Sequence, residues 1–169
     1  MNIVKFAMQM ELDGKAFYQQ AAAAAVQPEL RDILLYLADE EQRHFMFFKK
    51  LSEGDTSAAQ EELTNKDASL KDTKNVFVQL TENGTETSFG DDARSTWEEA
   101  LRIEEKAVKM YSEEALKESD PHRRALLERI ADEERNHVYL IDSVLSFMTD
   151  PESFADSKKY SDFQSWEGH

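Results

Sequence analysis

The sequence predicts an all-α fold, a four-helix bundle made of two repeated helical hairpins joined by a long crossover. The 169 residues include only five Gly and three Pro, so turn signals for a sheet are few, and 40% are apolar, which suits one domain. The chain repeats at an offset of 93 residues, the separation between the Glu-x-x-His motifs that begin at Glu41 and Glu134. Within each repeat, apolar residues recur at the spacing of two helices.

The first hairpin is predicted to contain a helix from Asn2, a good N-cap, to about Val26 and a helix from Pro28 to about Leu51. The inward stripe of the first helix comprises Val4, Met8, Glu11, Gly14 or Lys15, Tyr18 and Ala22. The inward stripe of the second comprises Leu30, Ile33, Leu34, Leu37, Glu41, His44, Phe48 and Leu51. Glu11, Glu41 and His44 thus stand among core positions, where a bare carboxylate is costly to bury.

The junction between the repeats, about residues 52–92, is polar and breaks the helical pattern. A structureless loop of this length is unusual in a compact domain, so a short helix docked on the bundle is expected at about residues 70–80. In the helix before the junction, Phe45, Met46 and Phe47 widen the apolar face. They indicate either extra core beneath the crossover or a subunit interface.

The second hairpin is predicted to repeat the first, with helices from about Asp92 to Glu118 and from Pro121 to about Met148. The inward stripe of the earlier helix comprises Trp97, Leu101, Glu104, Ala107 or Val108, and Tyr111. The inward stripe of the later helix comprises Leu126, Leu127, Ile130, Glu134, His137, Ile141 and Val144. The bundle is therefore assigned to residues 1–148, and residues 149–169 to a polar tail with at most one short helix.

Charge and composition exclude several classes of protein. The formal charge of −15 repels phosphate backbones and anionic membranes, so neither nucleic acid nor a membrane is expected as a partner. The absence of cysteine excludes disulfides and thiolate metal sites. No apolar run reaches the ~20 residues that span a bilayer, and the first residues lack a signal-peptide core, so a cytoplasmic protein is expected.

Six polar side chains, three from each repeat, are expected to meet in the core. They are Glu11, Glu41, His44, Glu104, Glu134 and His137. Four carboxylates cannot share a dry core without positive charge, and two divalent cations balance them if both imidazoles are neutral. The lone Glu of each repeat would be a terminal ligand, the Glu of each motif would bridge both cations, and each His would bind one. This set favours iron or manganese, with zinc as a further alternative.

Other residues near this centre are assigned supporting or surface positions. Tyr18 and Tyr111 are expected to donate a hydrogen bond to a ligand carboxylate of the opposite half, or else to fill the core. Gly14 and Ala107 leave room for a water or a diatomic ligand, or allow close helix packing. Residues beside the motifs and one His are assigned to the surface: Asp39, Glu40, Asp132, Glu133 and His122.

These motifs resemble the ferritin-like superfamily, and most closely the rubrerythrin-type di-iron domain: Glu11-x6-Tyr18, Glu41-x2-His44, Glu104-x6-Tyr111 and Glu134-x2-His137. The resemblance covers about residues 1–148 and implies an up-down-down-up bundle that binds two iron ions and often forms a homodimer. It also implies a peroxide reductase, in which two ferrous ions supply the electrons that cleave hydrogen peroxide. Full-length members carry a cysteine-ligated rubredoxin-like domain, so this cysteine-free chain is expected to need an external electron donor such as a rubredoxin-like protein.

The ligand set is equally similar to a ferroxidase centre. Typical rubrerythrins have an extra ligand Glu about one turn along the third helix, where this chain has Ala107 and Val108. The sequence therefore favours a di-iron oxidoreductase that reduces peroxide, or oxidises ferrous iron with peroxide or oxygen, in oxidative-stress defence. The alternative is an iron-binding or storage protein without rapid redox turnover.

Overall fold

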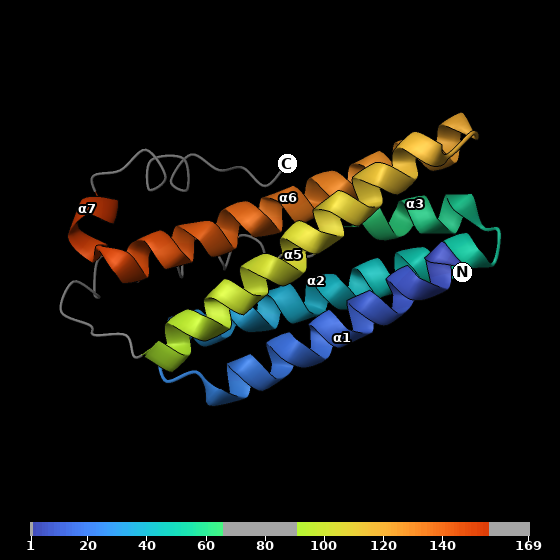
Figure 1. Ribbon diagram of the computed structural model, residues 1–169. Coiled ribbons are helices and arrows are strands. Elements are labelled where there is room, and N and C mark those ends of the chain that lie inside the picture. Colours follow the sequence, from blue (N-terminus) through green and yellow to red (C-terminus); the bar gives the residue numbers. More distant parts are fainter. Residues whose placement is uncertain (1, 66–90, 156–169) are drawn as a thin grey trace.

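The computed structural model describes residues 2–65 and 91–155, which are helical apart from short connections. The long helices in these ranges are α1 (Ile3–Ala24), α2 (Pro28–Ser52), α5 (Asp91–Lys117) and α6 (Pro121–Thr149). The short ones are α3 (Thr56–Thr64) and α7 (Pro151–Ala155). In Figure 1, α1 and α6 run in one direction and α2 and α5 in the other. The predicted all-α bundle with up-down-down-up order is confirmed.

Local sequence sets the helix ends. The Asn2 side chain accepts a hydrogen bond from the N–H of Val4 at 3.1 Å and so caps α1. Asp120 caps α6 in the same way, accepting from the N–H of Arg123 at 2.9 Å, and a proline occupies the first turn of both α2 and α6. The ends of the four long helices lie within two residues of those predicted.

The hydrophobic core consists of two clusters, one toward each end of the bundle. The first includes Ile33, Leu37, Trp97, Ile141 and Phe147. The second includes Phe47, Phe48, Tyr111, Leu126 and Ile130. On α1, Glu11 lies between Ala7 of the second cluster and Tyr18 of the first. On each of the other long helices, too, the predicted ligands lie between residues of the two clusters. A polar layer therefore separates the two apolar clusters across the middle of the bundle.

Burial follows the predicted inward stripes. Every predicted inward residue of α2 and α6 is buried. Of the alternatives left open, Gly14 rather than Lys15 is buried on α1, and Ala107 rather than Val108 on α5. The predicted inward residues that are only partly buried are Val4, Met8 and Leu101.

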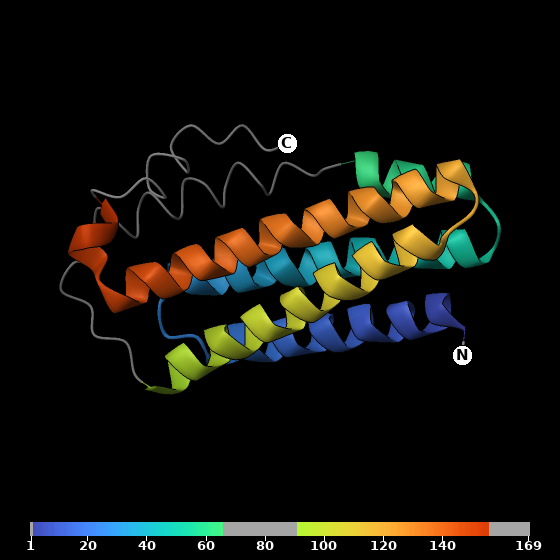
Figure 2. The ribbon, with the colours of Figure 1, turned by 45° about the horizontal axis from the view of Figure 1, so that its top comes forward.

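Helix α3 is a feature that the polar crossover sequence did not predict. Gly54, with φ of 80°, turns the chain after α2, and the Asp55 side chain accepts from the N–H of Ala58 at 2.9 Å to start α3. Ala59 and Leu63 are buried in the same cluster as Phe47, so Phe47 forms the extra core expected beneath the crossover, whereas Phe45 and Met46 are only partly buried. Figures 1 and 2 both place α3 at the end of the bundle where α6 begins. The helix predicted at about residues 70–80 lies outside the described residues.

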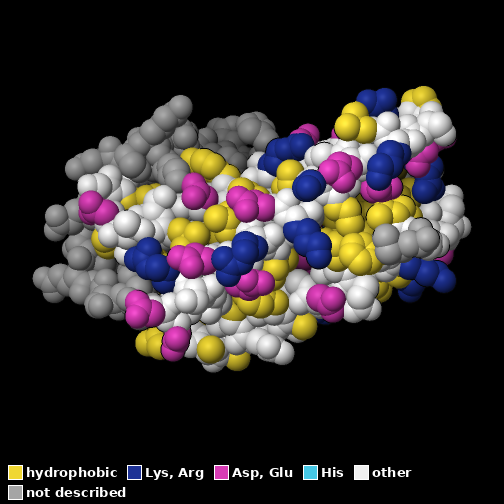
Figure 3. All heavy atoms as spheres, viewed as in Figure 1, with side chains coloured by type: hydrophobic (Ala, Val, Ile, Leu, Met, Phe, Trp, Pro, Cys, Tyr) yellow, Lys and Arg dark blue, Asp and Glu magenta, His cyan; other side chains and the backbone are white. Residues whose placement is uncertain are grey.

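After α6, the short helix α7 packs back onto the bundle. Phe154 is buried and contacts Phe147 edge-on, with ring centroids 5.9 Å apart. On the face shown in Figure 3, acidic and basic side chains are interspersed with apolar ones. Within the part of the chain that the structure describes, no helix has the length and apolarity needed to cross a membrane.

Candidate metal centre

All six predicted ligands lie in the polar layer, and each is at most 3% exposed. Ligand atoms of Glu41, His44, Glu134 and His137 lie within 4.8 Å of one another. The lone glutamates flank this group: a carboxylate oxygen of Glu11 lies 3.7 Å from Nδ1 of His44. By the repeat symmetry, an oxygen of Glu104 lies 3.7 Å from Nδ1 of His137. The structure thus brings together both halves of the predicted site.

Both imidazoles present Nδ1 to the centre. His44 Nδ1 lies 3.0 Å from Oε1 of Glu134, and His137 Nδ1 lies 3.1 Å from Oε2 of the same residue. The two rings stack with centroids 5.4 Å apart and planes inclined by 20°. Nδ1 is therefore the nitrogen of each ring that is placed to bind a cation, and Nε2 points outward.

The fit to cations is tested by buried polar atoms that make no hydrogen bond. Among the described residues, four ligand atoms are buried without a hydrogen bond, Glu11 Oε2, Glu41 Oε1, His44 Nδ1 and Glu134 Oε1, the last two lying 3.0 Å apart; Glu133 Oε1, outside the predicted ligand set, is a fifth such atom. Buried polar atoms are normally satisfied, so this concentration requires an explanation. The four ligand atoms are carboxylate oxygens and an imidazole nitrogen, which divalent iron and manganese bind. The residues therefore fit two divalent cations, which would satisfy these atoms and neutralise the four carboxylates.

Without cations, protons occupy the centre. Burial and the neighbouring carboxylates raise the pKa of Glu41 well above its usual range. Burial, followed by the charge of Glu134, raises the pKa of Glu104 to about 7. Burial alone would lower the pKa values of His44 and His137, but the surrounding carboxylates outweigh it and raise both. The metal-free centre thus holds protons where the cations would bind.

Two tyrosines cross the bundle to fix the lone glutamates. The Tyr18 hydroxyl donates to Oε1 of Glu104, and the Tyr111 hydroxyl donates to Oε1 of Glu11. These are the predicted hydrogen bonds to the carboxylate of the opposite half. Burial and the nearby carboxylates raise the pKa of both phenols, so both stay protonated and keep donating. Each leaves the second oxygen of its glutamate facing the centre.

Gly14 makes room for a ligand of the protein itself. A Cβ at this position would lie 2.5 Å from Oε2 of Glu41, closer than real Cβ contacts allow. The space beside Gly14 is therefore filled by the Glu41 carboxylate. The interpretation that Gly14 leaves room for a water or a diatomic ligand was wrong. Its repeat counterpart Ala107 is buried in the second apolar cluster.

The prediction that Glu40 and Glu133 are surface acids was wrong. Glu133 is only 5% exposed, and its Oε2 lies 3.1 Å from Nε2 of His44 in the other repeat. Glu40 occupies the equivalent place, with Oε2 3.6 Å from Nε2 of His137. The reason is that the histidines reach across the bundle: His44 of α2 lies beside Glu133 of α6, and His137 of α6 lies beside Glu40 of α2, so this flank of each helix is covered. Asp39, Asp132 and His122 are exposed, as predicted.

Glu133 and Glu40 set the tautomer of the imidazoles. A carboxylate beside Nε2 favours a proton on that nitrogen, which leaves Nδ1 free as a ligand. Burial raises the pKa of Glu133, but His44 and Arg43 outweigh it and lower the pKa to about 2, so the carboxylate is ionised at neutral pH. The signal in the sequence was the recurrence of a Glu before the motif Glu in both repeats.

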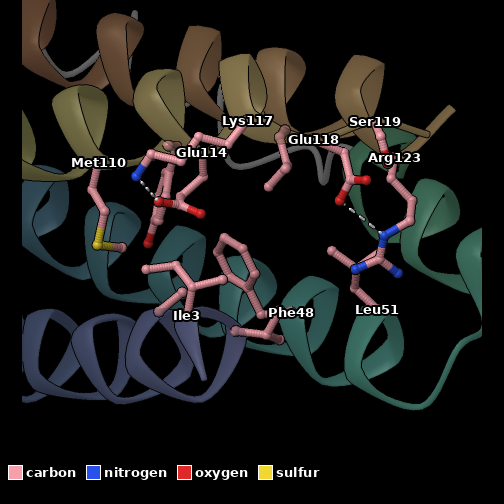
Figure 4. Close-up of a pocket in the computed structure, with 13 residues that line it drawn as sticks. Ile3, Phe48, Leu51, Met110, Glu114, Lys117, Glu118, Ser119 and Arg123 are labelled. Carbon is pink, nitrogen blue, oxygen red and sulfur yellow. Dashed lines mark hydrogen bonds and ion pairs between the residues drawn. The ribbon is translucent and has the colours of Figure 1, made fainter. Parts of the chain in front are cut away.

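A cavity of about 150 Å³ lies at the end of the bundle where α5 joins α6, and none of the six predicted ligands lines it. Its rim carries the ion pairs Lys117–Glu114, at 2.7 Å, and Arg123–Glu118, at 3.3 Å (Figure 4). Tyr111 lines the cavity and also donates to Glu11. One side chain therefore separates the cavity from a predicted ligand.

Comparison with known families supports the same assignment. The family model described as Rubrerythrin matches residues 2–145, which include the contributions of all four long helices to the polar layer. Comparisons with curated proteins and with solved structures gave no match. Because the match spans most of the chain and contains every predicted ligand, the chain belongs to the rubrerythrin family, whose domain is a ferritin-like di-iron bundle.

Proposed function

We propose that this protein is a di-iron carboxylate oxidoreductase that reduces hydrogen peroxide, or oxidises ferrous iron with peroxide or oxygen, in cytoplasmic oxidative-stress defence. The observation that carries the proposal is the convergence of four buried glutamates and two histidines with unsatisfied donor atoms. Two bound ferrous ions would supply one electron each, which matches the two electrons that convert hydrogen peroxide and two protons to two waters.

The residues of the chain hold this centre in a fixed geometry. The motif glutamates Glu41 and Glu134 lie with the two histidines in the middle of the layer and would hold both cations, and the lone glutamates Glu11 and Glu104 flank this group and would hold one each. The tyrosines orient the lone glutamates, and the outer carboxylates orient the imidazoles. The apolar clusters on both sides exclude bulk water. The cavity beside Tyr111 supports access for a small oxidant from that end of the bundle.

The proposal includes an external electron donor and a homodimer. The sequence contains no cysteine, so it holds no thiolate-bound iron that could return electrons to the centre. A separate rubredoxin-like protein would supply this function. The homodimer is proposed from the resemblance to the family and is tested by measuring the mass of the particle in solution.

Rapid mixing of the anaerobic, ferrous-loaded protein with hydrogen peroxide tests the activity. Appearance of ferric absorption with one equivalent of peroxide per two irons, faster than with dissolved oxygen, supports peroxide reduction. Faster oxidation by oxygen, with further ferrous ions consumed, supports a ferroxidase. Iron that binds but oxidises no faster than free ferrous ions in the same buffer would contradict an oxidoreductase and favour the alternative, an iron-binding or storage protein.

A further inference from the structure

Arg43 lies between the two carboxylates that orient the histidines. Its Nη2 donates to Glu40 Oε2 at 2.7 Å and also to Glu133 Oε2, and its Nε donates to Glu40 Oε1 at 3.2 Å. The side chains are 10%, 12% and 7% exposed for Arg43, Glu40 and Glu133. Two carboxylates from opposite repeats would repel each other here, and the planar guanidinium bridges them. One arginine therefore holds both outer partners of the two imidazoles.

The same guanidinium reaches helix α3. Arg43 Nη1 donates to the backbone carbonyl of Glu62 at 2.8 Å, in the last turn of α3. The last carbonyls of a helix lack partners within the helix, so a cation there satisfies them. Arg129 of α6 does the same for the next carbonyl, that of Leu63, at 2.6 Å. Of these two arginines, only Arg43 also contacts the carboxylates beside the histidines.

The repeat breaks its symmetry at Arg43. The equivalent position in the second half is Asn136, which is exposed. The neighbouring Arg135 points outward instead: it is 51% exposed and pairs with Asp132 at 2.5 Å. A single arginine thus serves both halves, on the side of the bundle that α3 covers.

We infer that Arg43 is a positioning residue that couples the metal centre to helix α3, so that metal loading and docking of α3 stabilise each other. This rests on the proposed metal centre. A cation that fixes Nδ1 of His44 fixes the ring, and the ring holds Glu133 through Nε2. Glu133 in turn holds Arg43, whose remaining nitrogen binds α3. By thermodynamic linkage, the free energy by which bound metal stabilises the docking of α3 equals the free energy by which docked α3 stabilises metal binding.

Hydrogen exchange of the full chain, with and without two equivalents of ferrous iron under anaerobic conditions, tests the coupling. Metal is expected to slow exchange of the amides of α3 in the wild-type protein. In Arg43→Gln this metal-dependent protection of α3 is expected to disappear. Metal affinity, measured by competition with a chelator, is expected to fall about 10- to 100-fold, the range for loss of an outer partner.

Three variants separate coupling from simple anchoring and from the effect of charge alone. Arg129→Gln removes the neighbouring anchor of α3, so it is expected to speed exchange of α3 in both states and to keep metal affinity near the wild-type value. Arg135→Gln removes an equal charge two residues before His137 and is expected to change neither the hydrogen exchange of α3 nor the metal affinity. Arg43→Lys keeps the charge but cannot bridge both carboxylates and the carbonyl, so it is expected to behave as Arg43→Gln does.

The wild-type experiment alone can overturn the inference, even if the Arg43 variants fail to fold. If iron binds at two equivalents and the exchange of α3 stays unchanged, the coupling is wrong and the metal centre stands. If the wild-type protein binds no iron, the proposed function fails as well, and the stoichiometry measured on the same sample identifies that case. Protection of α3 by metal that persists in Arg43→Gln would also overturn the role of Arg43.

Discussion

The Glu41 carboxylate occupies the space that a side chain at residue 14 would need. Gly14→Ala is therefore expected to displace this carboxylate and to lower metal affinity about tenfold or more, comparable with other disturbed ligand geometries. The fold is expected to survive, because the atom that must move is the end of a flexible side chain. Chelator competition measures the affinity, and thermal unfolding checks the fold.

Gly54→Ala is the matched control. Gly54 has φ of 80°, and nothing lies within 4 Å of the place that a Cβ would take. The substitution therefore strains only the backbone and is expected to cost about 1 kcal/mol of stability. Its metal affinity is expected to equal that of the wild-type protein. If Gly14→Ala binds metal as tightly as the wild type, the close approach of Gly14 to Glu41 does not matter for the centre.

The tyrosine hydroxyls hold the lone glutamates from across the bundle. Tyr111→Phe leaves Oε1 of Glu11 without its donor and is expected to lower the free energy of unfolding by about 1–3 kcal/mol. Tyr18→Phe is expected to have the same effect through Glu104, because the repeat places the two pairs equivalently. Chemical denaturation of the two metal-loaded variants measures this. Unfolding energies unchanged in both would show that these hydrogen bonds contribute nothing to the centre.

At the scale of residues, the ligands were predictable and their outer partners were not. A Glu or His in an apolar stripe is visible from its spacing, and the repeat doubles the signal. Glu133 lies one position before a ligand, on a flank that spacing alone assigns to solvent. That flank is covered only because the side chain of His44 reaches across from α2, with its Nε2 3.1 Å from Oε2 of Glu133.

Helix α3 buries two apolar side chains, Ala59 and Leu63, and Leu63 is the larger of the two and fully buried. Leu63→Ala is expected to lower the free energy of unfolding by about 2–5 kcal/mol, because it leaves a cavity beneath the helix. The loss is expected to include faster exchange of the amides of α3. Denaturation and hydrogen exchange measure the two effects.

Leu116→Ala provides the comparison for that substitution. Leu116 is 72% exposed on α5, so its truncation is expected to change stability by no more than about 0.5 kcal/mol. A Leu63→Ala protein as stable as Leu116→Ala would mean that α3 is not packed on the bundle as the structure has it.

At the scale of elements, the long helices follow from the sequence and α3 does not. Side-chain caps begin α1 and α6, a proline begins α2 and α6, and all four long helices have several turns of inward stripe. In contrast, α3 has nine residues, of which Ala59 and Leu63 are buried, too few to form a recognisable stripe. Its position depends on the underlying core and on Arg43 and Arg129, which are remote in sequence.

For the whole molecule, the centre makes stability depend on pH in the metal-free protein. Glu104 has a pKa near 7 in the folded chain against an ordinary 4.5, so the folded state holds a proton that the unfolded state releases. The raised pKa values of His44 and His137 act in the same direction above their ordinary 6.5. The free energy of unfolding of the metal-free protein is therefore expected to fall as pH rises from about 6 to about 8.

Thermal unfolding across this range, with a chelator present, measures the effect. Metal binding displaces the same protons, so the stabilisation by metal is expected to grow as pH rises. Metal-free protein that becomes more stable from about pH 6 to about pH 8 would show that these protons are not held in the centre.

The duplicated hairpin, the buried polar layer and its unsatisfied atoms all support one central claim, that two cations bind in the middle of this bundle. Metal analysis of protein purified without added metal, followed by titration with ferrous iron, tests it most directly. Two divalent ions per chain are expected in the wild-type protein, and about one in Glu41→Ala, which lacks a bridging carboxylate. No bound divalent ion in the wild type, or two ions bound with unchanged affinity in Glu41→Ala, would contradict it.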